Sequence, residues 1–388
     1  MRHRLLTGFL ILAAPVLAAA PANAAVKPGP SGPAFYTPPT TLPSGPHGTP
    51  IWQRKLTGKP VLKSARTNTL LLYTSSGLDN KPVAVSGDVA IPKGKAPKGG
   101  WPVISWAHGT VGIADACAPS KVGTQANYDS PLLNRWLKAG YAVVRTDYEG
   151  LGTPGPHPYL IGVSEGRSTL DMVRAARKLN PDLGSKLLIA GHSQGGQAAL
   201  FAASLSKRWT PELKLAGTVA FAPVSHLADQ APLLRALTQP GGLAPLGAMI
   251  MRGIDIADPA LGIPNLLGDK AKALYGQVDE RCLSDLAKPD SFGAIAAAEL
   301  LRPDADVAPI AAALGKNDDP QKLKIAGPVL IEQGKADTTV FPNFTASLAR
   351  ELKAKLTYKT YAGVTHGGAV TDKAPSNDAT KWIESRLG

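Results

Sequence analysis

Three side chains, the first of them near the middle of the chain, have the types and the order of a nucleophile, an acid and a base. Ser193 lies in the pentapeptide GHSQG, which matches the pattern G-x-S-x-G. In this pattern a strand turns sharply into a helix and exposes the serine hydroxyl. A nucleophilic serine needs a histidine that takes its proton and a carboxylate that orients the histidine. Asp337 and His366 follow Ser193 in the order that such a site requires.

The same pattern occurs a second time around Ser164, in GVSEG, so the surroundings of the two serines must distinguish them. The turn needs a strand before the serine and small residues after it. The apolar run 187–190 precedes Ser193, and Gly195 and Gly196 follow it. Ser164 follows the stretch TPGPHP, which is incompatible with a central strand. We therefore expect Ser193 to be the nucleophile and Ser164 to cap the next helix.

The base and the acid are chosen by their positions after predicted strands. Of the histidines after Ser193, His366 lies in a loop just behind a predicted strand, whereas His226 comes early and more naturally opens the next segment. Asp337 lies in the loop just beyond the apolar strand 329–332. The sequence therefore predicts His366 as the base and Asp337 as the acid. The rival carboxylates are Glu332, Asp318, Asp319 and Asp372.

An ester-cleaving serine also needs N–H donors for the developing oxyanion. The residue after the nucleophile, Gln194, supplies one main-chain donor in this kind of turn. The second donor is expected in the loop after the predicted strand 102–107, where Thr110 follows a glycine. We expect His108 and His192 to pack and hydrogen-bond behind these groups.

Short apolar runs alternate with helical patterns from residue 69 onward. The apolar runs predict strands at 70–73, 83–91, 102–107, 141–146, 186–190, 215–221, 329–332 and 356–361. The helical patterns cover 132–139, 164–179, 194–206 and 378–387. Such alternation predicts an α/β fold with a mostly parallel central sheet flanked by helices.

The alternation is interrupted in one long segment. Residues 226–322 contain several Ala- and Leu-rich helical patterns broken by Pro and Gly, and no strand pattern. We interpret this segment as a helical cap inserted into a core formed by residues 51–225 and 323–388. Within the cap, Leu243–Leu267 is an apolar stretch with two open interpretations: it opens at a lipid surface or it packs inward.

The N-terminus predicts export. Arg2 and Arg4 precede a short apolar run, and Ala22–Ala24 form an A-x-A cleavage site, so residues 1–24 are predicted to be a secretory signal peptide. Residues 25–50 are rich in Pro and Gly and predict an irregular arm. We expect no integral membrane segment and a secreted protein, either extracellular or periplasmic.

Charge and cysteine content exclude other classes of function. The net charge is +13, but the Lys and Arg residues are scattered and no nucleic-acid-binding motif occurs, so no nucleic-acid partner is expected. Cys117 and Cys282 are the only cysteines, and in an oxidising compartment we expect them to form a disulfide between core and cap. No cluster has metal-ligand spacing, so no metal and no cofactor is expected.

Three motifs together resemble the secretory lipase family of α/β-hydrolases: SWAHGT at 105–110, DYEGLG at 147–152 and GHSQGG at 191–196. The resemblance extends from about residue 50 to residue 388. It implies an α/β-hydrolase fold and the hydrolysis of carboxylic esters, acylglycerols among them, without a metal or organic cofactor. The family also includes esterases, so the preferred acyl chain length is left open.

The sequence thus predicts a serine hydrolase, a lipase or carboxylesterase, that forms an acyl-enzyme on Ser193. Its expected partner is an ester or acylglycerol substrate, met in solution or at a lipid–water interface. Two alternatives remain: an acyltransferase that uses the same acyl-enzyme, and a non-catalytic binding protein with this fold. The sequence carries no signal for the oligomeric state.

Overall fold

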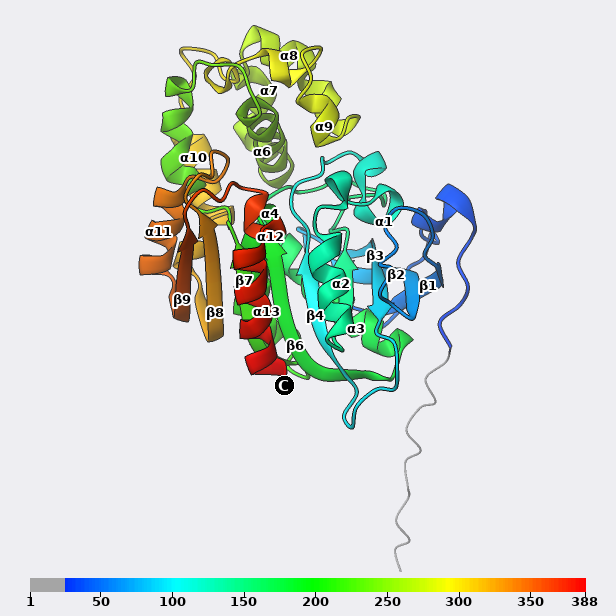
Figure 1. The fold of residues 1–388 in the computed structure, drawn as a ribbon. Helices are drawn as coiled ribbons and strands as arrows, with labels where there is room; N and C mark the ends of the chain where they lie inside the picture. Colours follow the sequence, from blue (N-terminus) through cyan, green and yellow to red (C-terminus); the bar gives the residue numbers. More distant parts are fainter. Residues whose placement is uncertain (1–24) are drawn as a thin grey trace, which may run out of the picture.

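The computed structural model describes residues 25–388, so the predicted signal peptide lies outside the described residues. Within this range one mixed sheet has the strand order β1-β2-β3-β5-β4-β6-β7-β8-β9 (Figure 1). The strands are β1 (Pro50–Lys55), β2 (Thr67–Ser76), β3 (Pro82–Ile91), β4 (Trp101–Ala107), β5 (Ala142–Thr146), β6 (Leu183–His192), β7 (Lys214–Phe221), β8 (Lys324–Gly334) and β9 (Lys353–Tyr361). The pairs from β1 to β3, and β3 with β5, are antiparallel, and the remaining pairs are parallel. The predicted mostly parallel sheet is confirmed.

Strand β1 is absent from the predicted strands, and its composition explains why. Its residues, PIWQRK, include two cations, and only Ile51 is buried. The strand lies at the edge of the sheet and pairs with β2 alone, so it needs no apolar run. Next to it, Phe35 and Tyr36 of the predicted irregular arm are buried against β1 and β2.

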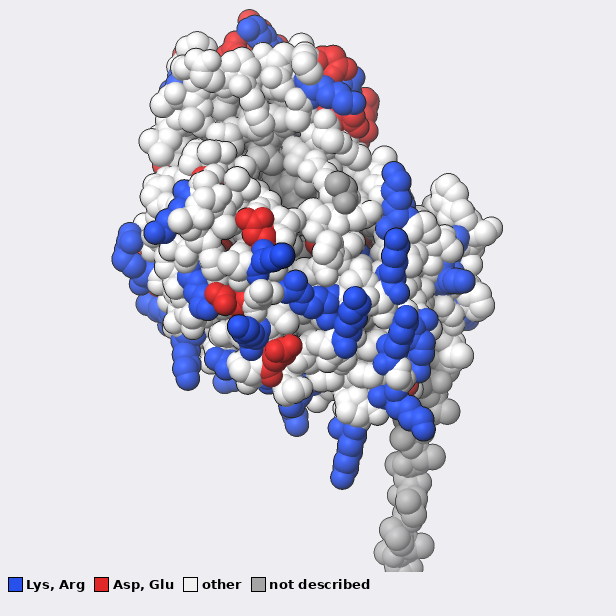
Figure 2. All heavy atoms as spheres, viewed as in Figure 1, with Lys and Arg blue, Asp and Glu red and all other residues white. Residues whose placement is uncertain are grey.

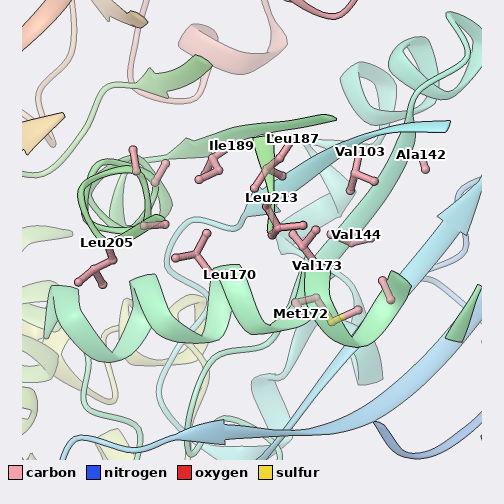
Figure 3. Close-up of a cluster of buried hydrophobic side chains, with 14 of the residues drawn as sticks. Val103, Ala142, Val144, Leu170, Met172, Val173, Leu187, Ile189, Leu205 and Leu213 are labelled. Atoms are coloured by element: carbon pink, nitrogen blue, oxygen red, sulfur yellow. The ribbon is translucent and has the colours of Figure 1, made fainter. Parts of the chain in front are cut away.

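Helices cover both faces of the sheet. Around the sheet the structure has α1 (Pro119–Val122), α2 (Ser130–Lys138), α3 (Gly162–Leu179), α4 (Gln194–Trp209), α11 (Pro342–Glu351), α12 (Gly368–Thr371) and α13 (Lys373–Leu387). Alternate residues of β6 point to opposite faces. Leu187 packs with Leu170 and Val173 of α3 (Figure 3), and Leu188 packs in a separate cluster with Trp136 and Ile383 of α2 and α13. The central strands are therefore buried on both sides.

The predicted role of Ser164 as a helix cap is wrong. Helix α3 begins at Gly162, with Ile161 in the capping position, so Ser164 lies inside the first turn. Its buried hydroxyl donates a hydrogen bond to Glu149 Oε2. The Ser164 hydroxyl therefore bonds the side chain of Glu149, which is distant in the sequence, and not a main-chain N–H at the start of its own helix as predicted.

The segment between β7 and β8 lies above the carboxyl ends of the parallel strands (Figure 1). In residues 226–322 the structure has helices of 3 to 15 residues and no sheet strand. The α-helices are α5 (Leu227–Gln230), α6 (Leu243–Ala257), α7 (Ile263–Leu266), α8 (Asp269–Leu274), α9 (Leu283–Leu286) and α10 (Ala308–Asn317). Met249, Met251 and Ile254 of α6 are at most 1% exposed and belong to a hydrophobic cluster of this segment. Most of α6 therefore packs inward in the structure.

A disulfide joins this segment to the rest of the molecule, as predicted. Cys117 and Cys282 are bonded, and they lie 165 residues apart in the sequence. Gly112 approaches the same point: a Cβ there would lie 2.8 Å from Cys282 Cα. The loop that follows β4 is thereby tied to the start of α9.

The outer surface distinguishes the two parts of the molecule. In the view of Figure 2, Lys and Arg side chains spread over the strands and helices of the core, and much of the segment above them is uncharged. None of the helices in residues 25–388 is long and apolar enough to cross a lipid bilayer.

Candidate active site

Ser193 lies in the turn between β6 and α4 and has an unusual backbone conformation. Its φ is 58° and its ψ is −118°, which a residue with a side chain adopts only under strain. The turn is also crowded. A Cβ on Gly191 would lie 2.0 Å from the carbonyl oxygen of Gly195, and a Cβ on Gly195 would lie 1.9 Å from that of Ala107. Glycine is therefore required on both sides of Ser193, as the sequence pattern indicates.

The proposed acid and base are in direct contact. His366 Nδ1 lies 2.8 Å from Asp337 Oδ2. The loops that carry them are joined by a main-chain hydrogen bond of 3.0 Å from Ala336 N–H to the Val364 carbonyl. Because β8 and β9 are parallel neighbours, the loops after them meet at one edge of the sheet.

Asp337 is held as an acceptor by several donors. The N–H groups of Thr339 and Val340 donate to its Oδ1 at 2.8 and 2.9 Å, and Gln333 Nε2 donates to its Oδ2 at 3.0 Å. Burial acts to raise the pKa of Asp337, but the hydrogen bond and charge interaction with His366, with the two N–H donors, hold this pKa below its ordinary value. An ionised Asp337 fixes the proton of His366 on Nδ1 and leaves Nε2 to act as a base.

His192 connects the serine turn to His366. Its Nε2 donates a 3.0 Å hydrogen bond to the His366 carbonyl, and the two rings lie 4.5 Å apart. Tyr128 Oη lies 3.1 Å from the other ring nitrogen of His192. Burial, together with the nearby His366, lowers the pKa of His192 to about 3, so this ring is neutral at neutral pH. No hydrogen bond within residues 25–388 joins Ser193 to His366 directly.

The two proposed oxyanion donors lie at neighbouring turns. Thr110 follows β4, and Gln194 is the first residue of α4. These turns touch, because a Cβ on Gly195 would also lie 2.6 Å from the carbonyl oxygen of His108. Within residues 25–388 neither the Thr110 N–H nor the Gln194 N–H donates to another group. The Gln194 N–H lies at the N-terminus of α4, where free N–H groups attract negative charge.

A cavity of about 350 Å³ opens beside Ser193 and Thr110. Its remaining wall is mainly apolar and comes from both the core and the helical segment. Phe341 and Phe344 contribute from the core side, and Leu233, at the cavity wall, is 52% exposed. The apolar side chains of the helical segment include Leu234, Leu237, Leu243, Leu246, Ile250 and Met251.

The rival residues have other partners. Glu332 is fully buried and accepts a 2.8 Å hydrogen bond from Tyr361 Oη. His226 lies 3.3 Å from Glu351 Oε2, at the start of α5. Asp372 precedes α13, and Asp318 is buried between α10 and β8. None of the rival carboxylates is hydrogen-bonded to His366.

The sequence reasoning missed a buried polar group behind Gln194. The side-chain Nε2 of Gln194 lies 2.8 Å from Glu165 Oε1 and 3.1 Å from His157 Nε2. Burial raises the pKa of Glu165 to about 8 and lowers that of His157 to about 4, so both are neutral at neutral pH. Glu165 belongs to the GVSEG motif around Ser164, but this motif gives no signal of the contact with Gln194, which lies 29 residues away in the sequence.

The described residues offer no obvious metal site. Within residues 25–388, no three or more His, Cys, Asp or Glu side chains gather as metal ligands would. The groups near Ser193 instead provide a hydroxyl, a carboxylate-bound imidazole and free N–H donors. These are the parts of a nucleophilic acyl-transfer site.

The sheet order, the strand–turn–helix at Ser193 and the positions of Asp337 and His366 define an α/β-hydrolase fold. Solved structures share it. Candida antarctica lipase A in its closed state has a TM-score of 0.74 at 23% identity, covering 91% of this chain and 85% of that chain. The rice cell wall degrading esterase LipA from Xanthomonas oryzae, in a ligand-bound form, has a TM-score of 0.72 at 20% identity, covering 88% of this chain and 100% of that chain. At these identities the likeness establishes the fold alone.

The family described as "Secretory lipase" matches residues 117–388, so the chain belongs to the secretory lipase family. The predicted resemblance is confirmed. Lipase A of Moesziomyces aphidis is 30% identical over 234 residues, which are 55% of this chain and 48% of that protein. A Mycobacterium tuberculosis protein named "Probable inactive lipase MT1628" is 26% identical over 271 residues, 66% of this chain and 59% of that protein. The chain thus spans about half the length of these curated relatives.

Proposed function

We propose that the protein is an exported carboxylic ester hydrolase that forms an acyl-enzyme on Ser193. The observation that carries the proposal is the 2.8 Å contact between His366 and Asp337 at the sheet edge where Ser193 occupies its strained turn. Each of these groups follows a parallel strand, and Ser193 faces an apolar cavity.

The reaction begins when Ser193 Oγ attacks the ester carbonyl carbon and His366 Nε2 takes the hydroxyl proton. Asp337 stabilises the imidazolium that forms. The carbonyl oxygen becomes an oxyanion and accepts hydrogen bonds from the N–H groups of Thr110 and Gln194. The ester C–O bond then breaks, His366 returns the proton to the leaving alkoxide, and the alcohol departs. Water, deprotonated by His366, attacks the acyl-enzyme in the same way and releases the acid.

The cavity supports an ester with an apolar acyl chain as the substrate. Its wall is mostly Leu, Ile, Met and Phe side chains, and Ser193 and Thr110 lie at that wall. Burying such a chain there stabilises the complex by about 0.8 kcal/mol per methylene group. Acylglycerols fit this description. A Malassezia globosa relative, 30% identical over 50% of this chain, is named a secreted triacylglycerol lipase. Together with the predicted signal peptide, this relative supports a location outside the cytoplasm.

The test is a series of initial rates on 4-nitrophenyl esters from acetate to palmitate, with a triacylglycerol emulsion alongside. The proposal predicts that the wild-type protein hydrolyses these esters and prefers acyl chains longer than acetate. The hydrolysis rate of S193A should be lower by several orders of magnitude. Hydrolysis by S193A at the wild-type rate would refute the acyl-enzyme on Ser193. Adding a competing alcohol distinguishes hydrolysis from the acyltransferase alternative. A hydrolase releases the free acid, whereas an acyltransferase forms a new ester with the added alcohol.

A non-catalytic role is the second alternative, since one relative carries the name of an inactive lipase. The hydrogen bond between Asp337 and His366, and the N–H groups of Thr110 and Gln194 that donate to no other group in residues 25–388, support a catalytic role instead. A protein that only binds a ligand has no need for this set. Absence of turnover by the wild-type protein on every ester in the series would favour the binding role.

A further inference from the structure

Glu165 lies directly behind the turn that contains Gln194 and connects it to another chain segment. It is completely buried in the first turn of α3. One of its oxygens, Oε1, accepts two hydrogen bonds: 2.8 Å from the side-chain Nε2 of Gln194 and 2.9 Å from the main-chain N–H of Leu160. The same atom therefore links the start of α4 to the segment that enters α3.

The segment 157–161 needs such support, because Leu160 has a φ of 59°. A side chain in this left-handed region is strained and persists only where surrounding contacts enforce it. The Leu160 N–H is bound by Glu165, and the Leu160 carbonyl accepts a 3.1 Å hydrogen bond from Gln197 Nε2 of α4. At the start of the segment, His157 contacts Gln194 through its Nε2.

The same segment also contacts the other proposed oxyanion donor. Tyr159, one residue before Leu160, has its Oη 2.6 Å from Thr110 Oγ1. Thr110 is thus fixed through Tyr159, and Gln194 is fixed through its own side chain. Both attachments meet in the segment 157–161 and at Glu165.

We propose that Glu165 is a positioning residue that holds the Thr110 and Gln194 N–H groups in place through Gln194 and the segment 157–161. This inference rests on the proposed function, in which those N–H groups bind the oxyanion. Stabilisation of an oxyanion depends on donors placed before the reaction begins. Loss of the anchor should therefore reduce kcat, whereas KM reflects the cavity and should change little.

The surroundings of Glu165 suggest a conservative replacement. Its second oxygen, Oε2, is buried without a hydrogen-bond partner in residues 25–388, and His157 Nε2 lies 3.9 Å from Oε1. Burial, and to a lesser extent the nearby Glu165 and Asp319, raises the pKa of the buried Asp318 well above its ordinary value. Such a site favours the neutral acid, and glutamine has the same shape and keeps an acceptor oxygen. E165Q should therefore preserve both hydrogen bonds, whereas E165L fills the volume and removes both.

The experiment measures kcat and KM on 4-nitrophenyl butyrate, together with melting temperature, for the mature protein and its variants. We expect kcat of E165L to fall at least about tenfold, below the full 10²- to 10³-fold cost of one oxyanion donor, with KM within about twofold. E165Q should stay within about threefold of the wild type. S164A is the matched control, because Ser164 is buried in the same helix turn but bonds Glu149, and its kcat should be unchanged.

A second pair of variants keeps the inference testable if E165L does not fold. Q194M removes the side-chain bonds of Gln194 but keeps its main-chain N–H, and Y159F removes the bond to Thr110. Both variants should lower kcat about threefold to tenfold without raising KM. In the double variant E165L/Q194M, kcat should be little lower than in Q194M alone, because both substitutions remove the same contact.

The inference is overturned if Q194M and Y159F both keep the wild-type kcat, or if E165Q loses as much as E165L. It is also overturned if the losses appear only in KM. Failure of the proposed function has a different signature, because the wild-type protein would then lack esterase activity or S193A would retain it.

Discussion

At the scale of single residues, the proposed mechanism depends on one carboxylate, Asp337, which accepts hydrogen bonds from several donors. Asp337 accepts hydrogen bonds from His366, Gln333, Thr339 and Val340, so an amide in its place would face donors on both sides. We predict that D337N lowers kcat by about 10³- to 10⁴-fold with little change in KM, because His366 loses its orienting anion.

The rival carboxylates are the controls for this substitution, with steady-state kinetics on a soluble ester as the measurement. Within residues 25–388 neither Glu332 nor Asp372 is hydrogen-bonded to His366, so E332Q and D372N should keep kcat within about threefold of the wild type. A normal kcat in D337N together with a large loss in D372N would show that the acid was wrongly assigned.

Glu332 has its own effect, on stability. Burial, only partly offset by the Tyr361 hydroxyl, raises the pKa of Glu332 from its ordinary value of 4.5 to about 8. Since the folded state binds the proton more tightly than the unfolded state, stability is greatest below the ordinary pKa and falls as pH rises from 4.5 toward 8. We predict that E332Q is less sensitive to this change. Urea unfolding at pH 5 and pH 9 measures the free energy of unfolding of the wild type and of E332Q. An equal decrease of this free energy between the two pH values in both proteins would contradict the prediction.

At the scale of elements, main-chain segments pack very closely at the turn between β6 and α4. A Cβ on Gly195 would lie 1.9 Å from the Ala107 carbonyl, so G195A forces two main-chain segments apart. We predict a loss of stability of about 1–3 kcal/mol or more and nearly complete loss of activity. The control is G276A, since a Cβ on Gly276 meets nothing within 4 Å. Thermal unfolding measures the stability of both variants. Equal melting temperatures for G195A and G276A would refute the packing argument.

The elements also show what a sequence can and cannot predict here. The strands buried on both faces were visible because they are continuous apolar runs, and Ser193 was distinguished from Ser164 by its preceding strand. Strand β1 was missed because an edge strand needs few buried residues. Glu165 and His157 were missed for a different reason. Their role comes from contacts with Gln194 that only the folded chain creates, and no local pattern encodes those contacts.

At the scale of the whole molecule, the disulfide holds the helical segment on the sheet. Cys117 follows the loop of Thr110, and Cys282 precedes α9, so the bond lies beside the candidate active site. Closing a loop of 165 residues allows up to about 5 kcal/mol of stabilisation in the chain-entropy approximation. We predict that the double variant C117A/C282A unfolds at a clearly lower temperature than the oxidised wild type. Equal unfolding temperatures would show that packing alone holds the segment.

The central claim is that Ser193 is the nucleophile, and covalent labelling tests it most directly. The mature protein is treated with a fluorophosphonate, digested and mapped by mass spectrometry, with S193A and S164A treated in parallel. We predict a single phosphonyl adduct on the peptide that contains Ser193, formed equally in S164A and absent in S193A. An adduct on Ser164, or an adduct that persists in S193A, would contradict the assignment.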